Sequence, residues 1–175
     1  MSALLLRGAV AVAVFSLPRI TTPAPDPVYD PLRLYEGTWV MTPTAGGATM
    51  TIANACGRIG TFYGCQQTVN RKRGGVILFI PRDTVGQYFT QAVAPHGRAM
   101  GRGDLTIAGT HWTYLGRDST AGGVTYYRTI NDFTGSDRIH FEIANSHDGT
   151  NWTVTQSGDE VRKTAAVWRI LPIKP

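Results

Sequence analysis

The sequence predicts an all-β protein whose strands form an antiparallel, up-and-down β-barrel. About ten short stretches are either apolar or alternate between apolar and polar residues, and helical periodicity is nearly absent. Clusters of Gly, Pro, Asp and Ser separate these stretches and predict tight turns. A barrel is favoured because closure removes exposed strand edges, and a two-sheet β-sandwich is the alternative.

The predicted strands follow one another closely from the first tryptophan onward. Their connections include "RKRGG", "PRDTVG", "APHG", "STAGG", "TGSD" and "HDGT". A chain of 175 residues with 42% hydrophobic residues is sufficient for one domain with an ordinary core. The strands are expected at residues 37–42, 48–56, 62–69, 75–80, 86–94, 98–109, 111–117, 123–133, 138–146 and 151–158.

The first 24 residues differ in composition from the rest and resemble a secretory signal peptide. A basic start is followed by the apolar run "GAVAVAVFSL" and by small residues suited to cleavage. The run is too short to span a bilayer, so no stable membrane anchor is expected, although a buried N-terminal strand or helix is an alternative. We therefore expect an exported protein, periplasmic or secreted, with a single barrel domain over residues 25–175.

The charge of the chain favours no nucleic-acid partner. Removal of residues 1–24 takes away Arg7 and Arg19 but no acidic residue, which lowers the net charge from +5 to +3. The only basic run, residues 71–73, precedes two glycines between predicted strands and is interpreted as a solvated hairpin turn.

Cys56 and Cys65 are the only cysteines in the chain. They lack the second pair of ligands that a structural zinc site needs, and their spacing is not that of a Cys-x-x-Cys redox motif. In an exported protein they are expected to form a disulfide. If residues 60–61 form a two-residue turn, the cysteines lie opposite each other, with Cα atoms roughly 4.5 to 5.5 Å apart. The expected disulfide is structural.

Alternation within strands predicts which side chains face the interior. In "RIHFEIA", Ile139, Phe141 and Ile143 share one face and should point inward, whereas His140 and Glu142 share the other. The stretch "GVILFI" is apolar on both faces, which suggests that another segment covers its outer face. The C-terminal "TAAVWRILPI" is the suggested cover.

Candidate ligand-binding residues lie on two neighbouring predicted strands. Trp112 and Tyr114 share one face, and Tyr126, Arg128 and Ile130 share another. If both faces point inward, Arg128 is held among aromatic rings and can bind an acidic or carbonyl-bearing ligand. In the opposite phase, Thr125 and Tyr127 are inside and Arg128 is in water. The candidate set is Tyr88, Trp112, Tyr114, Tyr126 and Arg128.

Two segments resemble a known family. "LYEGTWVM" is similar to the Gly-x-Trp element that opens the first strand of lipocalin-like, or calycin, barrels. "DRIHFEIANSHDGTNWTV", followed by Arg162, resembles the closing segment of small bacterial members, and the likeness spans roughly residues 32–163. It implies a barrel that binds a small apolar molecule, with Trp39 packed across the floor. Nitrobindins, a haem-binding branch, carry further glycines in the first strand and an iron-ligating histidine that no segment here matches, so no cofactor and no metal are expected.

No catalytic motif accompanies the barrel pattern. The function predicted first is an exported barrel that binds or carries a small hydrophobic or aromatic molecule. The first alternative is a small barrel enzyme, such as a cyclase, isomerase or lyase, with polar groups inside an apolar cavity. The second is a structural envelope protein with a filled core. The sequence does not determine the oligomeric state.

Overall fold

The computed structural model describes residues 26–59, 62–120 and 122–164. The predicted signal peptide and residues 165–173 of the suggested C-terminal cover lie outside this part of the chain. No helix in the described part is long and apolar enough to cross a membrane. The elements are η1 (Pro27–Tyr35), β1 (Gly37–Pro43), β2 (Met50–Ile59), β3 (Phe62–Val69), β4 (Lys72–Pro81), β5 (Gln87–Val93), β6 (Ala99–Ala108), β7 (His111–Thr120), β8 (Gly123–Thr134), β9 (Arg138–Ser146) and β10 (Thr153–Thr164).

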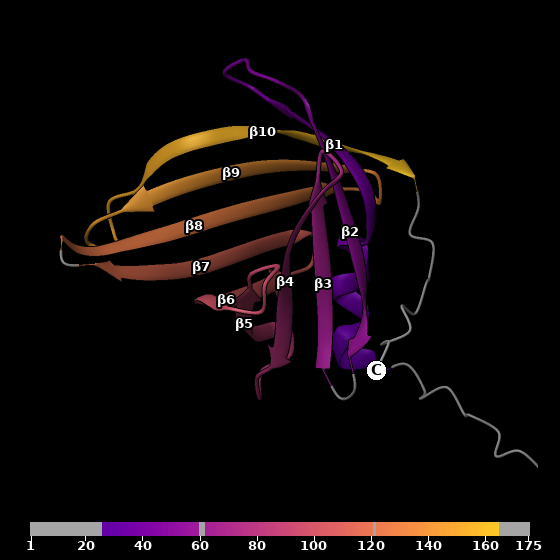
Figure 1. The fold of residues 1–175 in the computed structure, drawn as a ribbon, viewed down its shortest axis with the longest axis horizontal. Coiled ribbons are helices and arrows are strands. Elements are labelled where there is room, and N and C mark those ends of the chain that lie inside the picture. Colours follow the sequence, from indigo (N-terminus) through magenta and orange to yellow (C-terminus); the bar gives the residue numbers. More distant parts are fainter. Residues whose placement is uncertain (1–25, 60–61, 121, 165–175) are drawn as a thin grey trace, which may run out of the picture.

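The ten strands form one closed antiparallel barrel. Each strand pairs with its neighbours in the chain, and β1 pairs with β10 to complete the circle. At this seam, Trp39 of β1 lies opposite Arg162 of β10 on one side and Ile52 of β2 on the other. Strands β7 to β10 curve across one side of the barrel, while β2 to β4 run steeply down the other (Figure 1). The barrel prediction is confirmed, and the sandwich alternative is wrong.

The hairpin between β3 and β4 shows where turn residues misled the sequence prediction. The turn lies at Asn70 and Arg71, which adopt left-handed backbone angles with φ of 48° and 66°. Two consecutive left-handed residues fit the two-residue turns that match strand twist. The glycines expected in this turn instead lie within β4, where a Cβ on Gly75 would approach the carbonyl oxygen of Val93 to 2.4 Å. Their role there is to let the backbones approach.

The helix η1 was missing from the sequence predictions, because its prolines resemble an extended leader. The side chain of Asp26 accepts a hydrogen bond from the Val28 amide at 3.3 Å, and Pro27 occupies the first turn, where no amide donor is needed. Tyr29 and Leu32 are buried, and the Tyr29 ring stacks on Tyr63 at a centroid distance of 5.3 Å. Figure 1 shows η1, in indigo, beside the lower parts of β2 and β3. The helix thus contributes apolar side chains to the core at one end of the barrel.

Trp39 and Arg162 form the floor at this end of the barrel. The Trp39 side chain is fully buried, and its indole N–H donates to the Tyr35 carbonyl at 3.1 Å. The Arg162 guanidinium lies over the Trp39 ring, 4.1 Å from its centre, and donates to the carbonyl oxygens of Leu34, Glu36 and Ser136. One arginine therefore joins the last strand to the residues that precede the first. The floor position predicted for Trp39 is confirmed.

Cys56 and Cys65 form the predicted disulfide between β2 and β3. The two residues are directly opposite each other, and their Cα atoms are 4.0 Å apart, slightly closer than the predicted range. The flanking pair Ile59 and Phe62 has the predicted register. Both cysteines belong to the main core cluster or pack against it. The disulfide therefore joins two strands that already contact each other through the core.

Candidate binding site in the barrel interior

The interior is aromatic just above the floor. Trp39, Trp112, Phe133 and Tyr35 contact one another, with the Trp112 and Phe133 ring centres 4.8 Å apart. Alternate residues of a strand point to the same side, so the next inward-facing side chain on each strand lies two residues beyond the aromatic layer. On several strands these side chains form a second layer, and this layer surrounds a pocket.

The interior pocket has a volume of about 210 Å³. Gly103 of β6 and Gly116 of β7 lie opposite each other and contribute no side chain to it. A Cβ on Gly116 would meet only the Arg102 carbonyl oxygen, at the ordinary contact distance of 3.6 Å. The pocket therefore owes part of its space to two small residues. The interior-facing residues that line it are Ile77, Thr90, Ala92, Gly101, Gly103, Tyr114, Gly116, Tyr127 and Thr129.

Glu160 is a buried acidic residue on the interior face of β10. It lies between Met41 of β1 and Ile139 of β9, both buried, and is itself only 5% exposed. Its Oε2 atom is buried without a hydrogen-bond partner. Because burial disfavours the charged form, the pKa of Glu160 is raised to about 7.

Two tyrosines lie within electrostatic range of Glu160. Burial raises the pKa of Tyr35 well above its ordinary value, and the charge of Glu160 raises it further. The same two causes, in the same order, raise the pKa of Tyr114. Both phenols are therefore neutral hydrogen-bonding groups at ordinary pH. Tyr114 also lines the pocket, whereas Glu160 is not among the residues that line it.

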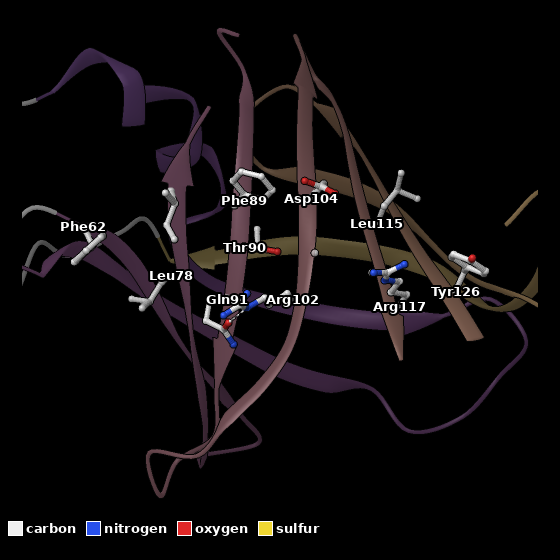
Figure 2. A pocket seen from close by; sticks show the side chains of 13 residues that line it. Phe62, Leu78, Phe89, Thr90, Gln91, Arg102, Asp104, Leu115, Arg117 and Tyr126 are labelled. Atoms are coloured by element: carbon white, nitrogen blue, oxygen red, sulfur yellow. Dashed lines mark hydrogen bonds between the residues drawn. The ribbon is translucent and has the colours of Figure 1, made fainter. Parts of the chain in front are cut away.

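A larger groove of about 810 Å³ lies on the outer face of the barrel, and the interior pocket is no less open than this groove. Phe89, Asp104 and Leu115 follow one another across β5, β6 and β7, as Figure 2 shows. Asp104 pairs with Arg82 at 2.9 Å, and Arg102 donates to Gln91 at 2.9 Å. These charged and polar groups thus already have partners. Among the described residues, the buried side-chain groups without partners are Trp112 Nε1, Arg128 Nε and Glu160 Oε2, and none of these residues lines either the groove or the interior pocket.

The predicted site residues separate into two groups. Tyr88, Trp112 and Tyr114 face the interior, where Tyr88 donates its hydroxyl to the Val28 carbonyl at 2.6 Å and Trp112 belongs to the aromatic layer. Tyr126 lines the outer groove. The strand alternation that places Trp112 and Tyr114 inside is confirmed, as is the interior position of Ile139 and Phe141.

Arg128 lies on the outer face, so the inward alternative is wrong. Its guanidinium pairs with Glu142 at 3.2 Å and lies over the ring of Trp152, 4.7 Å from the ring centre. Trp152 follows β9 and precedes β10, and the segment between these strands packs on the outer surface of β8, where Gly149 lies against the Tyr126 ring. A contact between distant segments, Trp152 on Arg128, therefore determines which face of β8 points outward. Tyr127, not Arg128, lines the interior pocket.

Sequence reasoning missed Glu160, which with Glu36 is one of two buried acidic residues in the described part of the chain. The predicted last strand ended at Gly158, whereas β10 continues to Thr164. In "DEVRK" the apolar Val161 is exposed and its neighbours Glu160 and Arg162 face inward, so the usual alternation signal is reversed. Within the described residues, no group of three or more His, Cys, Asp or Glu side chains is placed to hold a metal ion.

Comparison with known proteins adds little beyond the fold. The chain matches no protein-family model and no curated protein sequence. A crystal structure of Rv2717c from M. tuberculosis is similar to it over 79% of this chain and 99% of that chain, with 13% sequence identity and a TM-score of 0.47. At this level of similarity no function is carried across.

Proposed function

We propose that the protein is a lipocalin-like barrel that binds a small apolar or aromatic molecule in its interior. The observation that carries this proposal is the pocket of about 210 Å³ above the aromatic layer. For comparison, an apolar cavity of about 150 Å³ takes up benzene. The pocket is open rather than enclosed, and its volume is sufficient for a molecule with one aromatic ring. A barrel with a completely filled core would have no such space.

The lipocalin-like part of the proposal rests on the floor. Trp39 of the Gly-x-Trp element packs across the end of the barrel, and Arg162 of the last strand lies over its ring. The packing of Trp39 supports the resemblance of its segment to the Gly-x-Trp element of calycin barrels.

The pocket can be tested by filling it with a side chain. Gly116→Leu adds an interior side chain at a position where a Cβ fits without a clash, and Gly57→Leu adds the same side chain to β2, where no atom lies within 4 Å of the new Cβ. Gly57 follows the inward-facing Cys56 and therefore faces outward. We would titrate both variants and the wild-type protein with 2-phenylethanol by calorimetry, and examine each by native mass spectrometry for a molecule retained during purification.

The proposal expects Gly116→Leu to lose binding and Gly57→Leu to retain it. Folding of both variants is checked by circular dichroism and thermal melting. Equal affinity of the wild-type protein and a folded Gly116→Leu variant would place the ligand outside the interior pocket and contradict the proposal.

Export to an oxidising compartment is the second part of the proposal. Residues 1–24 resemble a signal peptide, and the Cys56–Cys65 disulfide is of a kind that persists outside the cytosol. Expression in the native cell, followed by fractionation and N-terminal sequencing, tests this. A cytosolic protein that keeps its original N-terminus would contradict it.

An enzyme is the second candidate function, and Glu160 is the observation that favours it. A carboxyl with a pKa of about 7 can both accept and donate a proton near neutral pH. Two neutral tyrosine hydroxyls nearby could donate hydrogen bonds to a developing negative charge. Turnover of a bound compound, measured by mass spectrometry before and after incubation and lost in Glu160→Gln, would distinguish an enzyme from a carrier.

A further inference from the structure

The charge inside the barrel restricts what the proposed pocket can bind. Glu160 is paired with Met41 on one neighbouring strand and with Ile139 on the other. No ion pair among residues 26–59, 62–120 and 122–164 includes it. Arg162, the next inward-facing residue on β10, donates to three backbone carbonyls instead. Glu160 thus has no cationic partner in the described protein.

A buried carboxylate without a partner is costly. Removing the charge from water disfavours folding by several kcal/mol unless a hydrogen bond or an opposite charge compensates it. Proteins satisfy most of their buried polar atoms, and an exception calls for a specific explanation, of which a missing ligand or water is one. The Oε2 atom of Glu160 is such an exception.

The aromatic side chains around Glu160 favour the same kind of ligand as its charge. Tyr35 contacts both Trp39 and Trp112 and lies within electrostatic range of Glu160. Aromatic faces attract cations, and this attraction is strongest where water is excluded. No other acidic or basic side chain shifts the pKa of Glu160, and the two tyrosines are the titratable groups whose pKa it shifts. A cation beside Glu160 would meet its carboxylate, with Tyr35 and Tyr114 as the tyrosines within electrostatic range, whereas an anion would be repelled.

Resting on the function proposed above, we propose that the interior site selects a small aromatic amine, whose protonated nitrogen pairs with the carboxylate of Glu160. The ring occupies the pocket lined by Tyr114, Thr129 and Tyr127. Because Glu160 does not itself line the pocket, the proposed ion pair requires the nitrogen to reach beyond Tyr114 to the unpartnered Oε2 atom on β10. Aromatic carboxylates of the same size are excluded, because their charge would lie near that of Glu160.

Three probes of nearly equal size test this selectivity. Phenethylamine carries a positive charge, 2-phenylethanol is neutral and phenylacetate is negative, so shape is nearly constant while charge changes. At pH 8, where Glu160 is largely ionised, calorimetry on the wild-type protein should show phenethylamine binding about 10- to 100-fold more tightly than 2-phenylethanol, the range expected for a hydrogen bond to a charged group. Phenylacetate should not bind measurably.

Glu160→Gln should remove this preference while leaving the affinity for 2-phenylethanol within a few-fold of the wild-type value. Glu142→Gln is the matched control, because Glu142 is the neighbouring strand's outward-facing glutamate and pairs with Arg128 outside the barrel. This control should retain the preference for the amine. A second measurement needs no variant: the wild-type affinity for phenethylamine should fall as the pH is lowered from 8 to 5.5, while the affinity for 2-phenylethanol stays constant.

The outcomes separate this inference from the proposed function. Binding of 2-phenylethanol without a preference for the amine, or a preference that survives in Glu160→Gln, overturns the inference and leaves the interior pocket as a binding site. Failure of all three probes to bind the wild-type protein overturns both.

Discussion

Glu160 should make the stability of the barrel depend on pH in a direction opposite to that of a salt-bridged carboxylate. Its pKa is about 7 in the folded protein, against an ordinary value of 4.5. The folded state therefore binds the proton more tightly than the unfolded state does. Linkage requires that stability be lost as the pH rises from 4.5 to about 7, and that it level off above this range.

The size of the effect follows from the same two values. One pH unit between the folded and unfolded pKa corresponds to about 1.4 kcal/mol, so the ionisation of Glu160 should destabilise the fold by about 3 kcal/mol at pH 8. The Glu160 residue is only 5% exposed, so solvent screening reduces this figure little. Glu36, whose pKa burial also raises, contributes in the same direction, but its contribution is common to the wild-type protein and a Glu160 variant.

Glu160→Gln isolates the contribution, because glutamine keeps the size of the side chain and cannot ionise. Urea unfolding at several values between pH 4.5 and 8.5, followed by tryptophan fluorescence, gives the free energy of unfolding of both proteins. As the pH rises, the free energy of unfolding of the variant should increase relative to that of the wild-type protein. At pH 8.5 the difference should reach about 3 kcal/mol in favour of the variant. Parallel curves over the whole range would refute the reasoning and show that the carboxyl is solvated or paired in solution.

Several other consequences of the structure are open to direct measurement. The oxidised protein should show no titratable thiol under denaturing conditions, and replacing Cys56 and Cys65 with serine should lower the free energy of unfolding by roughly 2 to 3 kcal/mol, as measured in urea. Arg162→Met should cost about 3 kcal/mol in the same assay, because three carbonyls lose a charged donor, and Arg162→Lys should recover only part of this loss. A chain ending at Ser146 lacks β10 and should show no cooperative melting by circular dichroism, and a cooperative transition would show that closure is dispensable. Arg128→Met should leave the affinity for phenethylamine, measured by calorimetry, within a few-fold of the wild-type value, and should lower the free energy of unfolding by at most about 1 kcal/mol. A tenfold loss of affinity would contradict the outer-face position of Arg128.

The interior site now has a charge of the opposite sign to the one considered from the sequence. An inward Arg128 would have favoured acidic ligands, but the cation lies outside and is paired with Glu142. Glu160, between Met41 and Ile139, is instead a buried ionisable side chain of the interior. The ligand proposed here is accordingly an amine, whereas an inward Arg128 would have favoured an acidic or carbonyl-bearing ligand. The small hydrophobic or aromatic molecule expected from the sequence stays a prediction.

The strands and their order could be predicted from the sequence because both depend on local signals. Alternation with a period of two and clusters of turn residues act over a few neighbouring positions, and the predicted and observed ranges of β3 and β9 are identical. The pairing of Cys56 with Cys65 is also local, since one tight turn determines the register of its hairpin. These features require no knowledge of distant parts of the chain.

The tertiary structure alone decided which faces of β8 and β10 are inside and what the interior contains. Alternation defines two faces of β8, but the packing of Trp152 on Arg128 determines which of them faces outward. Glu160 is buried because β10 closes the barrel against β1, and no local preference predicts that an acidic residue faces inward while Val161 faces outward. The proline-rich η1 likewise becomes a helix where Tyr29 and Leu32 can pack in the core. Burial is a property of contacts between distant segments, so the sequence determines the order of the strands while the closed barrel determines the chemistry inside it.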